Sequence, residues 1–158
     1  MPSSSPILAY VGLGANLGDR AGNIRAALEL LASGPELIVT KVSSLLENPA
    51  VGGPANSPQF LNAVAEVETT LGPKEVLQRL LDTEHALGRE RNQKWEPRQI
   101  DLDLLLFGDA VRTEPNLVLP HPRMHERRFV LQPLAEIAPD VLHPVLKRKA
   151  ADLLKGLE

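Results

Sequence analysis

Apolar residues alternate with polar ones, or gather in short runs, in four segments that predict β-strands. Residues 60–70 alternate most clearly, with Leu61 and Ala63 on one side and Asn62 and Val64 on the other, which is typical of a half-buried strand. The other three segments are short β-prone runs. The predicted strands cover residues 7–13, 36–46, 60–70 and 100–107.

Two longer segments instead place apolar residues three and four positions apart, as amphipathic helices do. The first follows Asp19, a good N-cap residue, and ends before Gly34-Pro35. The second has Pro73 in its first turn, where proline is tolerated, and ends at Gly88. Near the C-terminus, an apolar segment from Phe129 to Ile137 and a short one from about Ala150 predict two further helices.

The order strand, helix, strand, strand, helix, strand is the split β-α-β arrangement of ferredoxin-like α+β domains. We therefore expect an antiparallel sheet with helices packed on one face, and a single domain over residues 1–158. Gly108-Asp109 ends the last strand, and a hairpin with that strand is predicted to continue through Ala110-Val111.

The composition excludes several kinds of chemistry. The chain has no cysteine, which excludes disulfides, thiolate metal sites and thiol nucleophiles. A net charge of −3 gives no overall attraction to nucleic acid, so any bound anion needs a local basic cluster. The N-terminus lacks a basic region and an apolar run, so we expect a cytoplasmic protein without a membrane segment.

Asp101-Leu102-Asp103 lies within the last predicted strand and is the strongest chemical signal. Residues i and i+2 of a strand point to the same face about 7 Å apart, so the two carboxylates converge while Leu102 and Leu104 enter the core. Mg²⁺ prefers such hard oxygen ligands together with substrate phosphates. The alternative is a solvated strand face that pairs with Arg or Lys.

Four cations, Arg89, Arg91, Lys94 and Arg98, precede that strand within ten residues. Arginine forks match phosphate oxygens, so this segment predicts a polyphosphate site above the carboxylates. Trp95, the only tryptophan, lies in the same polar segment and is predicted to close over a ligand or the edge of the core. The alternative is a solvated charged loop that includes Glu90 and Glu96.

Two other motifs are less specific. The run from Gly12 to Gly18 lacks the spacing of a nucleotide-binding loop and is interpreted as a tight turn, with a pocket-lining role as the alternative. His121 and His125 are four residues apart among arginines; phosphate contact is favoured over zinc, because no third ligand is near.

The run from Trp95 to Leu105 resembles the signature of 6-hydroxymethyl-7,8-dihydropterin pyrophosphokinases, which ends in P-R-x-x-D-[LIV]-D. Other motifs of that family occur in the same order over roughly residues 7–145. They are Gly12–Gly18, Asn48-Pro49, Phe60-Leu61-Asn62, Gly88-Arg89-Glu90-Arg91 and Pro120–Phe129. The chain departs from the usual pattern at Glu96, where glycine is general.

The resemblance implies a role for each matching residue. Two Mg²⁺ ions would be held by Asp101 and Asp103, and Arg89 and Arg98 would join them as catalytic residues that stabilise developing charge. ATP would be bound by Arg89, Arg91, Trp95, Arg98, His121 and Arg127. The pterin would stack between Phe60 and Phe129 and be bound by Asn62 together with Asn48, Pro49 and Val51.

The resemblance also implies the reaction, in which a pterin hydroxymethyl oxygen attacks the β-phosphorus of ATP and AMP leaves. The partners would then be two small molecules, with no nucleic acid or membrane, and the oligomeric state stays open, a monomer being compatible. One alternative is a ferredoxin-like RNA-binding module, although aromatic residues make up only 3% of the chain. Another is an inactive homologue that only binds pterin.

Overall fold

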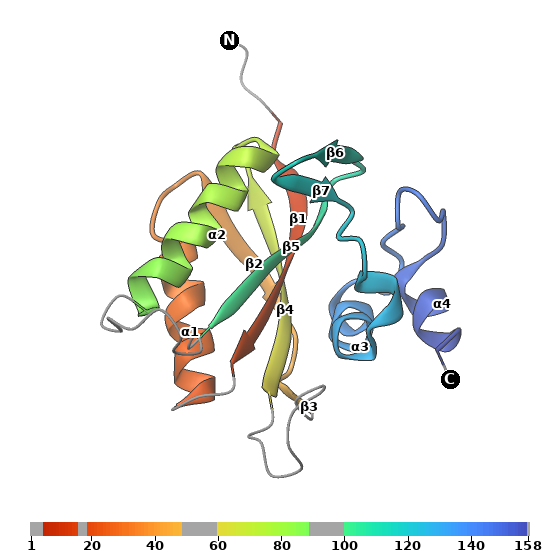
Figure 1. Cartoon of the computed structure of the whole chain (residues 1–158), viewed down its shortest axis with the longest axis horizontal. Coiled ribbons are helices and arrows are strands. Elements are labelled where there is room, and N and C mark those ends of the chain that lie inside the picture. Colours follow the sequence, from red (N-terminus) through yellow and green to blue (C-terminus); the bar gives the residue numbers. More distant parts are fainter. Residues whose placement is uncertain (1–4, 16–18, 49–59, 89–99, 158) are drawn as a thin grey trace.

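The computed structural model describes residues 5–15, 19–48, 60–88 and 100–157. The main sheet has the strand order β2-β4-β1-β5 with β3 also paired to β4, and every pairing is antiparallel (Figure 1). Its strands are β1 (Ile7–Ala15), β2 (Leu37–Val42), β3 (Leu46–Asn48), β4 (Phe60–Thr69) and β5 (Asp101–Phe107).

With the helices α1 (Arg20–Leu31) and α2 (Pro73–Gly88), this order confirms the predicted ferredoxin-like α+β arrangement. The predicted strand over 36–46 is in fact two strands, because regular pairing with β4 stops after Val42 and resumes at Leu46. Asp19 caps α1 as expected, since its Oδ1 accepts a hydrogen bond from the Gly22 N–H at 3.0 Å.

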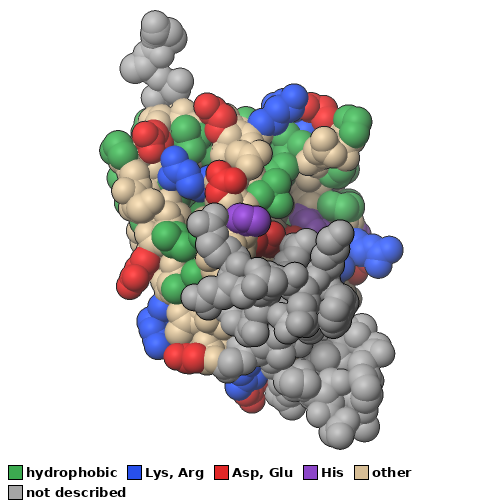
Figure 2. Space-filling view, turned by 60° about the vertical axis from the view of Figure 1, so that its left-hand side comes forward, with side chains coloured by type: hydrophobic (Ala, Val, Ile, Leu, Met, Phe, Trp, Pro, Cys, Tyr) green, Lys and Arg blue, Asp and Glu red, His purple; other side chains and the backbone are tan. Residues whose placement is uncertain are grey.

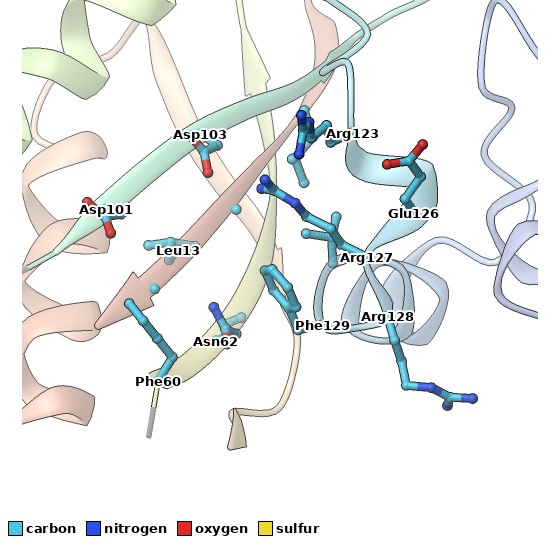
Figure 3. A pocket seen from close by; sticks show the side chains of 15 residues that line it. Leu13, Phe60, Asn62, Asp101, Asp103, Arg123, Glu126, Arg127, Arg128 and Phe129 are labelled. Atoms are coloured by element: carbon cyan, nitrogen blue, oxygen red, sulfur yellow. The ribbon is translucent and has the colours of Figure 1, made fainter. Parts of the chain in front are cut away.

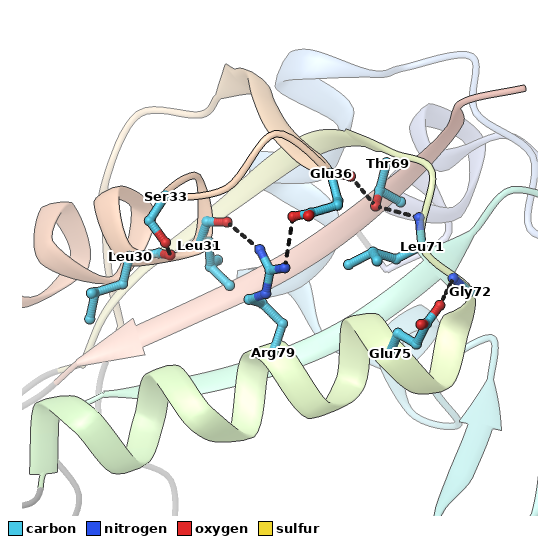
Figure 4. A network of polar contacts seen from close by, with 9 residues as sticks. All are labelled: Leu30, Leu31, Ser33, Glu36, Thr69, Leu71, Gly72, Glu75 and Arg79. Atoms are coloured by element: carbon cyan, nitrogen blue, oxygen red, sulfur yellow. Dashed lines mark hydrogen bonds and ion pairs between the residues drawn. The ribbon is translucent and has the colours of Figure 1, made fainter. Parts of the chain in front are cut away.

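One face of the sheet is covered by α1 and α2 (Figure 1). The apolar stripes of both helices pack there on alternate residues of β1, β4 and β5, including Val11, Leu13 and Leu104. A polar network beside this core joins the two helices (Figure 4). Arg79 of α2 donates to the Leu31 carbonyl at the end of α1 at 3.3 Å and to Glu36 Oε1 at 3.2 Å. It therefore satisfies a free helix carbonyl and fixes the start of β2.

The opposite face is covered by α3 (Arg128–Ile137), on which α4 (Ala150–Lys155) packs, so the expectation of helices on one face was wrong. The short 3₁₀ helix η1 (Met124–Glu126) leads into α3. Because both faces are covered, Val64 is as buried as Ala65, and the prediction of a half-buried strand over 60–70 was also wrong.

The buried Glu66 carboxylate on this second face accepts two side-chain hydrogen bonds. Tyr10 donates its hydroxyl to Glu66 Oε2 at 2.7 Å, and the Thr40 hydroxyl donates to Glu66 Oε1 at 2.8 Å. Burial, followed by the hydrogen bond to Glu66, raises the pKa of the Tyr10 hydroxyl well above its usual value. The Glu66 carboxylate is thus paired inside the sheet layer and links β1, β2 and β4.

After β5 the chain turns at Gly108, whose φ of 54° is a left-handed conformation that glycine adopts easily. A hairpin follows, but it joins β6 (Arg112–Glu114) to β7 (Leu117–Leu119). The predicted continuation of β5 into a hairpin through Ala110-Val111 was therefore wrong. Residues 110 and 111 lie outside the described strands.

The described surface mixes charge types. On the face seen in Figure 2, acidic and basic side chains lie among apolar and other residues. Within the described ranges, no helix has the length and apolar character needed to cross a bilayer.

The segment between α3 and α4 is organised around His143, which is 5% exposed. Its Nδ1 accepts hydrogen bonds from the backbone N–H groups of Leu146 at 3.0 Å and Val145 at 3.3 Å. The His125 ring lies edge-on to it, with ring centroids 5.9 Å apart. Burial, and next the neighbouring His125, lower the pKa of His143.

We expect this histidine to make stability depend on pH. Because the folded state binds its proton less readily than the unfolded state, the free energy of unfolding should fall as pH drops below about 6.5, the unfolded value. Urea unfolding between pH 5 and 8 measures this slope. His143→Asn keeps a neutral acceptor for the two N–H groups and should flatten the slope; an unchanged slope would contradict the assignment to His143.

Candidate active site

A pocket of about 630 Å³ opens on the face of the sheet that faces η1 and α3 (Figure 3). Three adjacent strands form its floor. In the register of these strands, Gly14 of β1 lies between Asp101 of β5 and Asn62 of β4. Gly12 likewise lies between Asp103 and Val64. Paired residues of an antiparallel sheet point to the same face, so the pocket has carboxylates on one side, an amide on the other and glycine between them.

The glycines of β1 make this floor a trough. β4 and β5 are two strand spacings apart, about 10 Å, and side chains on β1 would fill the space between them. At Gly14 an added Cβ would lie 2.9 Å from Asn62 Nδ2, which is too close. The interpretation of Gly12 and Gly14 as part of a tight turn was wrong, because β1 continues to Ala15 and both residues line the pocket.

The two aspartates are arranged as strand alternation predicts. Asp101 and Asp103 point into the pocket, whereas Leu102 and Leu104 are buried in the core below α1 and α2. The backbone between the two carboxylates is held from the outer edge of β5, where the Leu102 N–H donates to Glu84 Oε2 of α2 at 2.7 Å. Glu84 therefore fixes the strand segment from which both aspartates project.

The carboxylate pair suits a hard cation whose remaining coordination positions are filled by a substrate. In residues 5–15, 19–48, 60–88 and 100–157, no three His, Cys, Asp or Glu side chains are grouped to hold a metal by themselves. Mg²⁺ commonly takes one or two carboxylates and fills its remaining positions with phosphate oxygens and water. Asp101 and Asp103 thus fit a magnesium site that forms together with a phosphorylated ligand.

Basic groups face the aspartates across the pocket. Figure 3 shows the Arg127 and Arg123 guanidinium groups directed toward the Asp103 side, while Arg128 points away. The pKa of His121 is lowered by burial, against an opposing effect of Asp103 and with a further lowering by Arg127. Its Nδ1 accepts a hydrogen bond from the Arg123 N–H at 3.3 Å, so the neutral ring carries its proton on Nε2.

The other end of the pocket is aromatic. Phe60 at the start of β4 and Phe129 at the start of α3 flank Asn62 (Figure 3). Asn62 is 9% exposed, and its Oδ1 has no hydrogen-bond partner within the described part of the chain. A buried amide oxygen without a partner is costly unless a ligand donates to it. This end therefore suits a flat heterocycle with N–H groups along one edge.

The structure brings together seven of the predicted site residues: Phe60, Asn62, Asp101, Asp103, His121, Arg127 and Phe129. Asn48 pairs with Phe60 through the backbone of β3, which places it beside the same strand end. The remaining predicted residues, Arg89, Arg91, Trp95, Arg98, Pro49 and Val51, lie outside the described residues.

Seven residues that line the pocket within the described ranges were not predicted as site residues, namely Leu13, Ala63, Leu105, Arg123, Glu126, Arg128 and Val130. Arg123 and Glu126 lie within the Pro120–Phe129 motif, which is the only sequence signal that could have pointed to them. His125 is directed elsewhere than the Asp103 side of the pocket: it contacts Glu126 at 3.7 Å and packs against His143. Its environment is that of a partly buried structural residue.

Residues 10–139 match the sequence profile of the family described as 7,8-dihydro-6-hydroxymethylpterin-pyrophosphokinase (HPPK). The chain belongs to this family. The match runs from within β1 to just beyond α3 and includes each pocket-lining residue of the described ranges.

Individual relatives agree with the family match. The chain is 47% identical over 135 residues to the 2-amino-4-hydroxy-6-hydroxymethyldihydropteridine pyrophosphokinase of Bacillus subtilis (strain 168), covering 85% of this chain and 80% of that protein. It is 40% identical over 139 residues to the protein of the same name from Aquifex aeolicus (strain VF5), covering 88% and 85%.

Solved structures support the fold. A crystal structure of wild-type Plasmodium falciparum HPPK-DHPS with pterin and p-hydroxybenzoate aligns with a TM-score of 0.72 at 17% identity, over 98% of this chain and 44% of that one. The chain thus spans less than half the length of this longer protein. At such low identity the likeness establishes the ferredoxin-like fold of the HPPK structures and nothing about ligands.

Proposed function

We propose that this HPPK family member transfers pyrophosphate from ATP to the hydroxymethyl group of 6-hydroxymethyl-7,8-dihydropterin and releases AMP, a step of folate biosynthesis. The hydroxymethyl oxygen forms a bond to the β-phosphorus, the bond from that phosphorus to the AMP oxygen breaks, and the hydroxyl proton is lost. Family membership over residues 10–139 supports this reaction.

The observation that carries the proposal is the division of the pocket by its glycine trough. Asp101 and Asp103 lie on one side, beside Arg127, and Phe60, Asn62 and Phe129 lie on the other. A polyphosphate and a flat heterocycle would therefore meet above Gly12 and Gly14. Such a meeting point is what transfer between two substrates requires, because much of the barrier is removed by orientation alone.

On the phosphate side, we infer that Asp101 and Asp103 hold two Mg²⁺ ions. Bound Mg²⁺ neutralises charge on the transferring group and orients it for in-line displacement. Arg127 would place its guanidinium against the same phosphates, and the His121 Nε2–H would donate to a phosphate oxygen. Arg89, Arg91, Trp95 and Arg98 are proposed to complete the ATP site, with Arg89 and Arg98 stabilising the charge that develops in transfer.

On the pterin side, we infer that the ring stacks between Phe60 and Phe129. The unpartnered Oδ1 of Asn62 would accept from an N–H group of the ring, which removes the cost of leaving it buried. Backbone near Asn48, Pro49 and Val51 is proposed to bind the rest of that edge. Exclusion of water from the pocket when both substrates are bound would limit hydrolysis of ATP.

The direct test is to incubate the protein with ATP, Mg²⁺ and the reduced hydroxymethylpterin and to identify the nucleotide product. AMP formed in proportion to pterin shows attack at the β-phosphorus. ADP, or AMP without pterin, would contradict the proposal, and pterin binding without turnover would identify a binding protein only. A cytoplasmic location and the absence of nucleic-acid partners stay predictions.

We expect Phe60→Ala to weaken pterin binding far more than ATP binding. Stacking of a base-like ring on an aromatic face contributes about 1 to 3 kcal/mol, by analogy with nucleobases. Isothermal titration with the pterin, and separately with ATP and Mg²⁺, measures both affinities. Equal losses for the two ligands, or loss of the folded state, would contradict a stacking role.

A further inference from the structure

A contact outside the pocket joins α3 to the segment between β2 and β3. The Ser44 N–H donates to both carboxylate oxygens of Glu136, at 3.2 and 3.0 Å, and the Ser44 hydroxyl donates to Oε1 at 2.8 Å. Lys41 Nζ also donates to the Ile137 carbonyl at 3.4 Å. Both Ser44 and Glu136 are exposed, and neither lines the pocket. The C-terminal end of α3 is thus tied to the sheet edge by polar contacts.

The Ser44 end of this contact is fixed relative to β4. Ser43 donates its N–H to the Val64 carbonyl and accepts from the Val64 N–H through its hydroxyl, both at 2.9 Å. The Ser43 hydroxyl thus takes the place of a backbone acceptor in the pairing with β4. Regular pairing of β2 ends here, and Ser44 is directed to α3. β3 then starts at Leu46 and pairs with β4 as far as Phe60. Ser44 is therefore built into the same strand assembly as Phe60 and Asn62.

The Glu136 end of this contact lies on the same helix as Phe129. Residues seven apart lie on the same helix face, so α3 presents Phe129 and Glu136 on one side about 10 Å apart along its axis. Between them, Pro133 has no N–H to donate to the Phe129 carbonyl. The Phe129 carbonyl therefore lacks its helix hydrogen bond. Contacts from outside α3 then have more influence on the position of Phe129.

We propose that Glu136 is a positioning residue for the pterin site. Through Ser44 it sets the separation between Phe129 on α3 and the Phe60 and Asn62 side chains on β4. This inference rests on the proposed function, because it assumes that the pterin lies between the two aromatic rings. Glu136 acts on the ring only through the placement of α3, and it has no role toward ATP.

The test compares Glu136→Ala with Glu136→Gln by isothermal titration of 6-hydroxymethyl-7,8-dihydropterin in the presence of Mg²⁺ and α,β-methylene-ATP. The methylene group replaces the oxygen whose bond must break, so no product forms. We expect Glu136→Ala to raise the pterin Kd about 3- to 10-fold, the range for residues that act on a site without touching the ligand. Glu136→Gln keeps an acceptor for Ser44 and should stay within about twofold of the parent protein.

Controls separate this role from a general loss of structure. Gln132→Ala removes an exposed side chain from the same helix and should leave the pterin Kd unchanged. The Kd of the ATP analogue alone should be the same in all variants. An unchanged pterin Kd in Glu136→Ala, or equal weakening of both ligands with a lower Tm, would overturn the positioning role. Phe129→Ala tests the site itself: if it leaves pterin binding unchanged, the pterin site fails, and the positioning role with it.

Discussion

Replacement of Asp103 by Asn should reduce kcat by at least about 100-fold while the protein still folds. The substitution removes one negative charge from the carboxylate pair that faces the pocket, and metal stabilisation of a transferring phosphate contributes several kcal/mol, or about 10² to 10³ in rate. The shape is nearly isosteric, and Asp103 is exposed to the pocket, so the core on the other side of β5 keeps its packing. AMP release followed across a range of Mg²⁺ concentrations measures the effect.

Asp109→Asn is the matched control, since Asp109 is an exposed carboxylate in the turn that follows the same strand. It should retain the parent rate and the parent Mg²⁺ dependence. Asp101→Asn should resemble Asp103→Asn, because both residues belong to one site. A near-normal kcat for either site variant at ordinary Mg²⁺ would show that the pair does not hold the metal.

The main strands and the first two helices could be predicted in their order along the chain because each element follows from local periodicity. Strand alternation at Asp101 and Asp103 also placed both carboxylates correctly, since period two is a property of any strand. Periodicity could not predict the helical layer on the second face of the sheet. The apolar segment of α3 was visible, but nothing local says which sheet face it covers, and burial of Val64 and Glu66 depends on that choice.

Contacts between residues that are distant in sequence could not be predicted either. Gly12 and Gly14 read as turn residues, because the trough exists only once Asn62 and Asp101 are paired beside them. Ser44 and Glu136 are 92 residues apart, and neither belongs to a motif. The proposed roles of Arg89, Arg91, Trp95 and Arg98 rest on the sequence signature. A single domain over residues 1–158 also stays a prediction.

Replacement of Arg127 by Ala should lower kcat/KM by about 10²- to 10³-fold, the usual cost of removing one group that is preorganised for developing charge. Its guanidinium reaches from the start of α3 toward the Asp103 side of the pocket, where the phosphates are proposed to lie. Arg127→Lys should recover only part of the loss, because a point charge cannot replace a bidentate fork. Single-turnover rates and ATP affinities on the same preparations measure the effect.

A competing role for Arg127 follows from its second contact. The guanidinium carbon lies 5.7 Å from the centre of the Phe129 ring, within the range of a cation–π interaction. If Arg127 only supports that ring, Arg127→Ala should weaken pterin binding and leave the single-turnover rate at saturating pterin unchanged. Arg25→Ala, which removes an exposed arginine from α1 on the opposite face of the sheet, controls for the change in net charge. A rate that falls at saturating concentrations of both substrates, with the Tm and the Arg25→Ala rate unchanged, assigns Arg127 to the transferring phosphates.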